Sequence, residues 1–234
     1  MAELLYEGKA KQVYKTEKED EYLIHYKDDA TAGNGVKHDK FEGKGVLNNT
    51  ISCIIFDMLE EAGIKTHMIK KLNERDILVK KVDIFPLEVI IRNITTGSFC
   101  RRLGAPEGIV LDEPIFEISY KNDEYGDPLI NDDHAVALKL ATREELAYIK
   151  ETTLKINELL KEFFLSMNLK LVDFKIEFGK TADGTILLAD EISPDSCRLW
   201  DVDTNQKYDK DVFRQDIGDL IETYKAVLAR MQNK

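Results

Sequence analysis

The sequence predicts an α+β fold of two lobes, with antiparallel strands in the first part and strands mixed with two long helices in the second. Three observations support this prediction. Apolar and polar residues alternate over short stretches within residues 4–26, as expected of half-buried strands. Residues 142–163 and 211–228 instead repeat apolar side chains at helical spacing. Strict alternation returns in residues 171–178, between the two helices.

Composition narrows the class of protein. The chain has 234 residues, of which 43% are hydrophobic and 33% charged, so we expect a soluble, globular protein with a real core. No apolar run approaches the ~20 residues that span a bilayer, and residues 1–14 lack the pattern of a signal peptide. The net charge of -11 disfavours nonspecific nucleic-acid binding. The three cysteines lack zinc-like spacing, which indicates free thiols and a cytoplasmic location.

The first expected element is a hairpin over residues 4–14. Its connection contains a glycine followed by Lys9 and Lys11, and an extended loop places both ammonium groups on one side. Lysine binds phosphate as a point charge, so the loop suits a phosphate chain, with a solvated turn as the alternative. A strand is expected next at Glu21–Tyr26. Residues 28–35 are rich in turn formers and oxygen donors, which predicts a ligand-approaching loop or a plain turn.

A helix is expected from Lys44 to Ala62, with a wide apolar stripe that belongs to the core rather than to a cofactor site. A strand is expected at Asp76–Val82. Because the chain has no flexible linker, a hinge at this strand would divide it into lobes 1–82 and 83–234. Backbone groups at such a hinge would be placed to contact a purine, and Lys80 is a candidate nucleotide contact there.

A buried strand is expected at Leu87–Ile94, which is apolar and β-branched. Arg92 lies inside it, and a buried arginine needs an anionic partner. The hydroxyls and amides of Thr95–Ser98 follow in a predicted loop, so Arg92 and this loop suit a carboxylate or phosphate. An internal salt bridge to Glu88 is the alternative. Residues 106–133 are expected to be mostly irregular, and a loop of that length is often functional.

The two long helices carry recognisable starting signals. Thr142 and Glu145 form a capping box, so the first helix should begin directly after Thr142. The last helix should begin near Asp209 or Asp211. Its buried face is expected to consist of Phe213, Ile217, Leu220, Ile221, Tyr224 and Leu228. Arg214, near its start, should point either into a cleft or to the surface.

The stretch 171–192 carries the strongest functional signal. The Asp-Gly pair at 183–184 predicts a two-residue hairpin turn with a return strand over residues 185–192. In that register Glu177 faces Asp190, at a Cβ spacing of about 4.5–5.5 Å. Two carboxylates so close repel each other, and a hard divalent cation with oxygen ligands would relieve the repulsion. A surface hairpin with a solvated face is the alternative. The two faces expected for the first strand are Val172, Phe174, Ile176 and Phe178, and opposite them Asp173, Lys175 and Glu177.

Lysines for a polyphosphate, two acids for Mg²⁺ and a charged strand for the reacting group are what an ATP-dependent phosphoryl transfer needs. The residues alone do not name the acceptor. The segments YEGKAKQVY, DDATAGNG, KGVLNN, PLEVIIRNITTGS, LVDFKIEFG and DEISPDSCRLWD occur in this order and cover almost the whole chain. Together they resemble the phosphoribosylaminoimidazole-succinocarboxamide (SAICAR) synthetase family.

The resemblance implies a SAICAR synthetase-like fold, related to ATP-grasp enzymes and kinases, with an ATP cleft between the lobes. It also implies a reaction in purine biosynthesis, in which ATP, L-aspartate and carboxyaminoimidazole ribonucleotide (CAIR) give SAICAR, ADP and phosphate. ATP and Mg²⁺ would be the cofactors, and the enzyme would be a homodimer. Neither a nucleic acid nor a membrane is an expected partner.

The resemblance assigns roles to residues at matching positions. The implied nucleotide-binding residues are Lys9, Ala10, Lys11, Lys80 and Lys175. The implied substrate-binding residues are Arg92, Ser98, Asp173, Arg198, Lys121 and Arg214. Glu177 and Asp190 match the metal ligands, and catalysis is expected to involve Lys175, Lys11 and Asp195. We expect Lys175 to steady the transferred phosphoryl group.

Three other functions compete with a ligase. A small-molecule kinase with the same ATP cleft would turn over ATP without an amine. A glycosidase would use Glu177 and Asp190 as its carboxylate pair and work in EDTA, but it leaves Lys9, Lys11 and Arg92 without a role. A non-catalytic nucleotide-binding module would bind ATP without turnover.

Overall fold

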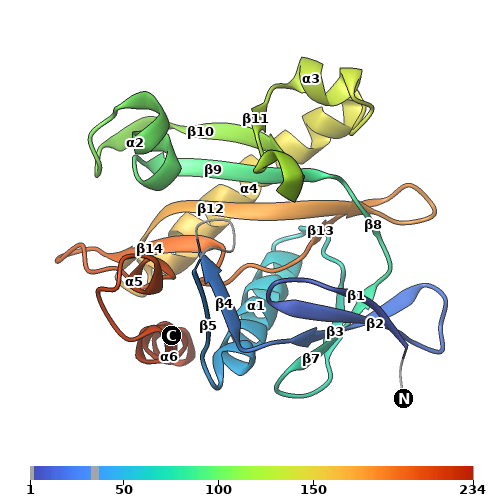
Figure 1. Ribbon diagram of the computed structural model, residues 1–234, viewed down its shortest axis with the longest axis horizontal. Coiled ribbons are helices and arrows are strands. Elements are labelled where there is room, and N and C mark those ends of the chain that lie inside the picture. Colours follow the sequence, from blue (N-terminus) through green and yellow to red (C-terminus); the bar gives the residue numbers. More distant parts are fainter. Residues whose placement is uncertain (1–2, 33–36, 234) are drawn as a thin grey trace.

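The computed structural model describes residues 3–32 and 37–233 and has the α+β fold that the sequence predicts. Two large antiparallel sheets and one two-stranded sheet make up its β-structure. In the view of Figure 1 the two large sheets lie one above the other, and helix α4 runs behind the upper one. Within the described residues, no helix is both long enough and apolar enough to cross a membrane.

The first sheet has the strand order β1-β2-β3-β7-β6. Its strands are β1 (Leu4–Glu7), β2 (Lys11–Lys15), β3 (Glu21–Tyr26), β6 (Met68–Lys71) and β7 (Asp76–Lys80). The predicted N-terminal hairpin and the next two predicted strands are confirmed. The sequence does not predict β6, because the four residues MIKK show no alternation and three of them are exposed.

A two-stranded sheet replaces part of the loop expected at residues 28–35. Strand β4 (Asp29–Ala32) pairs with β5 (Lys37–Lys40) in antiparallel register. The prediction of a loop is therefore wrong at Asp29–Ala32, while residues 33–36 lie outside the described residues. KHDK is wholly polar, and aspartate and alanine have low strand propensity in Asp29–Ala32, so the sequence carries only a weak strand signal here.

Helix α1 (Lys44–Glu61) is confirmed and buries its apolar stripe. The same helix also buries a polar stripe that the sequence analysis did not predict, made of Lys44, Asn48, Asn49 and Ser52. Ser52 Oγ donates a hydrogen bond to the Ile192 carbonyl at 3.0 Å. The polar stripe therefore faces the chain segment that follows β13.

The second sheet has the order β11-β10-β9-β12-β13, and β8 and β14 also pair with β12. Its strands are β8 (Asp83–Ile84), β9 (Leu87–Ile94), β10 (Val110–Tyr120), β11 (Leu129–Ile130), β12 (Leu169–Lys180), β13 (Ile186–Ala189) and β14 (Cys197–Asp201). Strand β9 has the predicted bounds. Because β12 pairs with four other strands, its side chains are held firmly in place.

Strand β10 contradicts the prediction that residues 106–133 are mostly irregular. Pro114 conceals the strand in the sequence, because proline cannot donate to a sheet ladder and usually marks a break. In the structure the pairing with β9 shifts between Val110 and Ile115, so Pro114 falls where the ladder is already interrupted. The same region contains the short helices η1 (Asp123–Tyr125) and α3 (Asp132–Ala137).

The remaining helices are α2 (Gly97–Leu103), α4 (Arg143–Leu165), α5 (Asp211–Arg214) and α6 (Leu220–Gln232). The capping box of Thr142 and Glu145 is confirmed at the start of α4. The single last helix is wrong, because the chain breaks after α5 and α6 begins anew with Asp219 as N-cap. Ile217 lies in that break and is 57% exposed, so its predicted burial is also wrong.

The β12–β13 hairpin has a different register from the predicted one. Glu177 lies opposite Ala189 rather than opposite Asp190, which lies beyond the end of β13. The connection is longer than two residues, since Thr181 N donates to the Thr185 carbonyl at 2.9 Å. Within it Gly184 has a φ of 87°. A glycine in this left-handed position is typical of three-residue hairpin loops.

Alternation along β12 holds from Phe174 onward but not before it. The pairing with β14 shifts register between Leu171 and Asp173. Val172 packs in a separate cluster with Ile94 and Trp200 instead of joining Phe174 in the main core. The prediction that Val172 and Phe174 share a face is therefore wrong, because the irregular pairing turns Val172 away from the face that carries Phe174.

One large cluster of buried apolar side chains connects the two large sheets. It contains Ile24 and Ile77 from the first sheet and Val89 and Ile176 from the second. Helices α1 and α4 contribute further members, such as Phe56. The division of the chain at residue 82 stays a prediction.

Candidate active site

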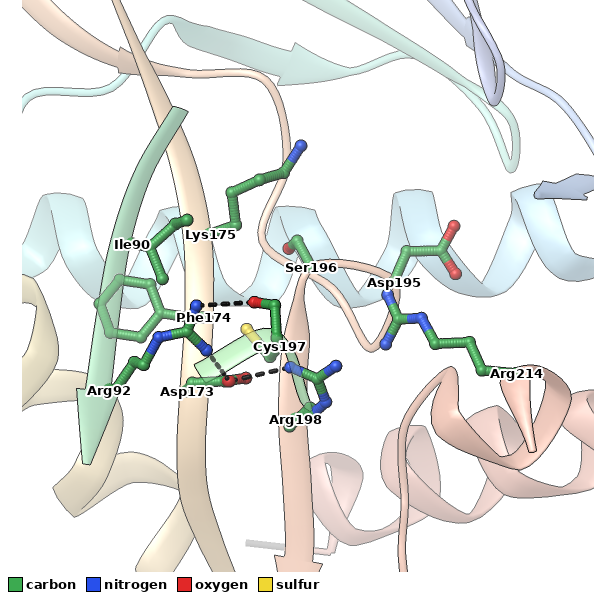
Figure 2. A pocket seen from close by; sticks show the side chains of 11 residues that line it. Ile90, Arg92, Asp173, Phe174, Lys175, Asp195, Ser196, Cys197, Arg198 and Arg214 are labelled. Carbon is green, nitrogen blue, oxygen red and sulfur yellow. Dashed lines mark hydrogen bonds and ion pairs between the residues drawn. The ribbon is translucent and has the colours of Figure 1, made fainter. Parts of the chain in front are cut away.

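An arginine-lined pocket lies where β9, β12 and β14 run side by side. Asp173 of β12 is opposite both Arg92 of β9 and Arg198 of β14. Its Oδ2 accepts hydrogen bonds from Arg92 Nη1 at 3.2 Å and from Arg198 Nη1 at 2.8 Å. Figure 2 shows the two guanidinium groups converging on this carboxylate. Strand register thus brings together three predicted substrate-binding residues that are far apart in the sequence.

The first turn of α2 closes one side of the pocket. Ser98 Oγ accepts a hydrogen bond from Arg92 Nη2 at 3.0 Å. The loop predicted at Thr95–Ser98 is wrong for its second half, because Gly97 and Ser98 begin a helix. Gly97 has a φ of 57°, and a Cβ atom there would lie 2.7 Å from Arg198 Nη2. Only glycine lets Arg198 approach the turn this closely.

Arg92 forms internal salt bridges, but not with the predicted partner. Its Nε donates to Glu117 Oε2 at 2.7 Å, whereas Glu88 binds Lys175. These contacts belong to a row of alternating positive and negative side chains around the pocket. Each residue in the row forms an ion pair with the next, in the order Arg102, Glu117, Arg92, Asp173, Arg198, Asp211 and Arg214. The charged side chains that line the pocket are the cations Arg92, Lys175, Arg198 and Arg214 and the anions Asp173 and Asp195, so positive charge is in excess. The pocket therefore suits an anionic group.

Arg214 ends α5 and is an exposed residue that also lines the pocket. Figure 2 shows it extending from the side opposite Arg92 in that view. Its Nη1 donates to Asp211 Oδ1 at 2.7 Å. Both predicted placements therefore apply in part, because Arg214 lies at the surface and also lines the pocket.

Lys175 points away from the arginines and toward a second group of charges. Its Nζ lies 2.6 Å from Glu88 Oε1 and 4.0 Å from Glu177 Oε1. Burial lowers the pKa of Lys175, but Glu88, Glu177 and Asp190 outweigh it and hold that pKa above the usual range. Lys175 is therefore a permanent cation, suited to holding a phosphoryl group and not to acting as a base.

The predicted phosphate-binding loop connects β1 and β2, and its two lysines have different partners. Lys9 Nζ lies 2.7 Å from Asp123 Oδ1, at an exposed position. Lys11 forms an ion pair with Asp190, and its Nζ lies 3.6 Å from Glu191 Oε2. Between them, the Ala10 carbonyl accepts a hydrogen bond from the Lys27 amide at 2.8 Å. The loop thus reaches Asp123 of η1 and the chain segment that directly follows β13.

Glu177 and Asp190 lie close together although they are not cross-strand partners. Burial raises the pKa of Glu177, and the charge of Asp190 raises it further. Burial also opposes the ionisation of Asp190, but Lys11 and Lys175 outweigh it and lower its pKa to about 2. Lys121 Nζ lies 2.7 and 2.6 Å from the two carboxylate oxygens of Glu177. Each acid is thus paired with a lysine.

The two acids fit a magnesium ion as part of its coordination shell. Carboxylate oxygens are preferred Mg²⁺ ligands, and Mg²⁺ is usually held by one or two carboxylates together with phosphates and water. No group of three or more His, Cys, Asp and Glu side chains in the described part of the chain can hold a metal. The remaining ligands would therefore come from nucleotide phosphates and water.

Lys80 lies at the end of β7 and is an exposed residue. Its backbone amide donates to the His67 carbonyl at 2.7 Å. Lys80, Lys11 and Asp190 all act electrostatically on the buried His67 ring, which places Lys80 in the same neighbourhood. Its contact with a nucleotide stays a prediction.

Asp195 is held by three residues that the sequence analysis missed. Lys44 Nζ lies 2.7 Å and Lys210 Nζ 3.5 Å from Asp195 Oδ2, and the Tyr224 hydroxyl donates to Oδ1 at 2.5 Å. Burial opposes the ionisation of Asp195, but the two lysines outweigh it and hold its pKa far below the usual range. Asp195 therefore stays an anion. Its three partners come from α1, the start of α5 and α6, and no local pattern links them.

The fold and the site together define a protein with a cationic pocket that suits an anionic ligand. A family model described as SAICAR synthetase matches residues 4–231 of the chain. The chain is 67% identical to the phosphoribosylaminoimidazole-succinocarboxamide synthase of Finegoldia magna and 61% identical to that of Caldanaerobacter subterraneus. These alignments cover 98% of this chain and 99% and 97% of the two relatives. The protein belongs to the SAICAR synthetase family.

Solved structures support the same assignment. A SAICAR synthetase structure in complex with ADP superimposes with a TM-score of 0.95 at 50% identity, covering 98% of this chain and 97% of the other. The phosphoribosylaminoimidazole-succinocarboxamide synthase of Ehrlichia chaffeensis superimposes with a TM-score of 0.96 at 45% identity, covering 98% of both chains. The predicted family and fold class are therefore confirmed.

Proposed function

We propose that this enzyme joins L-aspartate to the carboxylate of CAIR, using ATP, to give SAICAR, ADP and phosphate in purine biosynthesis. The observation that carries the proposal is the placement of the arginine-lined pocket beside the lysine and carboxylate groups of β12 and the β1–β2 loop. Lys175 lines that pocket and also faces the carboxylates. A phosphoryl group and an anionic acceptor bound in these two places would meet at Lys175.

The chemistry requires activation of a carboxylate. A carboxylate is a poor electrophile, because an amine attacking it would have to expel oxide. Transfer of the ATP γ-phosphoryl group to a CAIR carboxylate oxygen releases ADP and gives an acyl phosphate. The aspartate amine then attacks the acyl carbon and phosphate leaves, so the amine loses a proton and the amide bond forms. Bringing three reactants together in one pocket supplies several kcal/mol of the barrier reduction.

The positive groups stabilise the charge of the transferred phosphoryl group. Lys175 is the permanent cation nearest the junction, and Lys11 and Lys9 approach from the β1–β2 loop. We propose that Ala10 and Lys80 contact the nucleotide as well. Mg²⁺ held by Glu177 and Asp190 would neutralise phosphate charge when bound.

The arginine-lined pocket is the proposed site of the CAIR phosphate. Arg92, Ser98 and Arg198 offer donors on three sides, with Arg214 at the rim. Asp173 orients the two arginines instead of contacting the phosphate, since it would repel that group. Lys121 is proposed to contact substrate once Glu177 turns to the metal. Asp195 contributes a fixed negative charge to the pocket wall, because its low pKa prevents it from acting as a base.

Phosphate release tests the proposal most directly. Purified enzyme should release phosphate from ATP only when Mg²⁺, CAIR and L-aspartate are all present, and a succinocarboxamide product should accumulate. Release without aspartate would indicate a leaking intermediate or a kinase. Absence of turnover by folded, ATP-binding protein would indicate a non-catalytic module.

Oxygen labelling tests the acyl phosphate. When the CAIR carboxylate carries ¹⁸O, one labelled oxygen should appear in the released phosphate, because that oxygen bridges carbon and phosphorus. Unlabelled phosphate would overturn this step while leaving the overall reaction intact.

Neutralising either acid tests the metal site. Glu177→Gln and Asp190→Asn should each lower Mg²⁺-dependent turnover at least 100-fold while the protein stays folded, as judged by circular dichroism. A near-normal rate in Asp190→Asn would remove Asp190 from the metal site. Glu151→Gln, which changes an exposed acid on α4, is the matched control and should leave the rate unchanged.

We also propose that the enzyme works in the cytoplasm as a homodimer. The cytoplasm is consistent with Cys53, Cys100 and Cys197, which are all free thiols. Sedimentation equilibrium tests the dimer, which should give twice the mass of the 26.8 kDa chain. A single species at the mass of one chain would contradict it.

A further inference from the structure

Asp195 is held at both carboxylate oxygens by side chains from α1, the start of α5 and α6. Its Oδ2 lies 2.7 Å from Lys44 Nζ and 3.5 Å from Lys210 Nζ. Its Oδ1 accepts a hydrogen bond from the Tyr224 hydroxyl at 2.5 Å. The second torsion of an aspartate side chain is broad, so contacts with a single oxygen leave the carboxylate free to rotate. The Tyr224 hydroxyl therefore contributes a constraint that the two lysines do not.

The backbone around Asp195 is fixed by hydrogen bonds. The Asp195 amide donates to Ser193 Oγ at 3.1 Å, and the Pro194 carbonyl accepts from the Lys210 amide at 3.0 Å. The Asp195 side chain is only 5% exposed, and the residue lines the arginine-lined pocket. Figure 2 shows it on the same side of the pocket as Arg214 in that view. With the backbone fixed, the direction of the two carboxylate oxygens depends on the side-chain torsions alone.

Packing holds Tyr224 in the place from which it contacts Asp195. The residue is 0% exposed and belongs to a separate apolar cluster with Leu47 of α1, Phe213 of α5 and Leu220 of α6. Burial raises the pKa of Tyr224 well above its usual range, and the charge of Asp195 raises it further, so the hydroxyl stays a donor. The C-terminal helix is thus connected to the pocket wall through this hydroxyl.

We propose that Tyr224 is a positioning residue for Asp195. A carboxylate oxygen can accept two hydrogen bonds, and the lysines occupy Oδ2 while Tyr224 occupies one position on Oδ1. By fixing the rotation of the carboxylate, the hydroxyl directs the remaining acceptor position of Oδ1 toward a hydrogen-bond donor of the bound substrate. The inference rests on the proposed function, in which Asp195 belongs to the wall of the CAIR site. A role of Tyr224 in core packing alone would require its ring but not its hydroxyl.

Tyr224→Phe removes the hydroxyl and keeps the ring, so it tests the contact with Asp195 directly. Tyr208→Phe is the matched control, because it removes a hydroxyl from a ring that also packs against α6, with its centroid 4.5 Å from Arg230 Cζ. Leu220→Ala is the control for stability, since it opens a cavity in the cluster that holds Tyr224. Asp195→Ala removes both oxygens and is the reference for loss of the positioned group. Asp195→Asn, which removes the charge, takes its place if the alanine variant does not fold.

The measurement is steady-state kinetics with CAIR and then ATP as the varied substrate, well below the melting temperature of each variant. Tyr224→Phe should lower kcat/KM for CAIR about tenfold, the lower end of what one hydrogen bond to a charged group contributes, while the KM for ATP stays within about twofold. Tyr208→Phe and Leu220→Ala should leave kcat/KM for CAIR within about twofold, although Leu220→Ala lowers the melting temperature at least as much as Tyr224→Phe. In the background of the Asp195 variant, Tyr224→Phe should change kcat/KM for CAIR by less than about twofold, because the group that it positions is absent.

The outcomes distinguish this inference from the proposed function. An unchanged kcat/KM for CAIR in Tyr224→Phe, with the Asp195 variant strongly impaired, would overturn only the role of Tyr224. A decrease of the same size in Leu220→Ala, or an undiminished effect of Tyr224→Phe in the background of the Asp195 variant, would overturn it too, because packing would then explain the effect. Normal kinetics with CAIR in the Asp195 variant would remove Asp195 from the site and overturn the inference, while formation of SAICAR by the wild type would leave the proposed function standing. Absence of that product from the wild-type enzyme would overturn the proposed function itself.

Discussion

Replacing Lys44 with methionine tests the energetic role of the buried charges behind the pocket. The Lys44 side chain is 0% exposed and lies at the first residue of α1, where the helix dipole disfavours a cation. Its ion-pair partner is Asp195, which is also buried. Methionine has a similar length and no charge, so it fills the space and leaves Asp195 with less compensation.

The expected loss of stability follows from the remaining partners of Asp195. Removing one partner of a buried ion pair costs about 3–5 kcal/mol. Lys210 and Tyr224 still contact Asp195 in Lys44→Met, so the lower end of this range applies, about 3 kcal/mol. For a chain of this length each kcal/mol lowers the melting temperature by about 2–4 °C. Lys44→Met should therefore melt about 6–12 °C below the wild type.

A double-mutant cycle in urea isolates the pair. Asp195→Asn in the Lys44→Met background should recover at least about 1.5 kcal/mol relative to the sum of the single changes, because the buried carboxylate left without Lys44 is then no longer charged. Lys155→Met, at an exposed ion pair on α4, is the control and should change stability by less than about 0.5 kcal/mol. Additive single changes, or a loss below about 1 kcal/mol in Lys44→Met, would refute the reasoning.

Two further predictions concern the titration of Asp209 and the close approach of Arg198 to Gly97. Burial raises the pKa of Asp209 to about 7. Between pH values of about 4 and 7, the Asp209 carboxyl group therefore stays protonated in the folded state but is ionised in the unfolded state. The free energy of unfolding thus falls as pH rises through this range. Asp209→Asn should flatten the dependence of the urea midpoint on pH between 5 and 7, and an unchanged slope would contradict this. Gly97→Ala should displace Arg198 and raise the Michaelis constant for CAIR about tenfold while that for ATP stays constant in steady-state kinetics. Equal changes in both constants would point to a general disturbance of the fold.

Local signals in the sequence predict most of the regular structure. The capping box at Thr142 predicts the start of α4, because both of its hydrogen bonds lie within four residues. The apolar, β-branched run Leu87–Ile94 predicts β9 for a similar reason, because that signal is also local. Strand β10 escapes prediction because Pro114 is a local signal against a strand, and tertiary pairing with β9 overrides it. Pairing energy comes from residues distant in the sequence, so a local pattern does not contain it.

Prediction of the site depends on a different kind of information. Charged residues on a single strand, such as Asp173 and Lys175, follow from alternation alone. The predicted cross-strand neighbour of Glu177 is wrong by one residue, because turn length sets hairpin register and the Asp-Gly pair at 183–184 is compatible with more than one loop. Lys44 reaches Asp195 across 151 positions of sequence, and only the packing of α1 against the segment after β13 brings them together.

Ion pairs explain why the proposed nucleotide site contains acids and lysines in nearly equal number. Four lysines proposed to face the nucleotide or substrate are each paired with a carboxylate: Lys9 with Asp123, Lys11 with Asp190, Lys121 with Glu177 and Lys175 with Glu88. Without a nucleotide, the pairs of Lys11 with Asp190 and of Lys121 with the buried Glu177 spare the fold the cost of unpaired charges away from water, whereas Lys9 and Asp123 are exposed. Phosphates that took over Lys11 and Lys121 would leave Glu177 and Asp190 uncompensated unless a cation arrived with them. The same two acids that would bind Mg²⁺ therefore also make binding of the nucleotide and of the metal depend on each other.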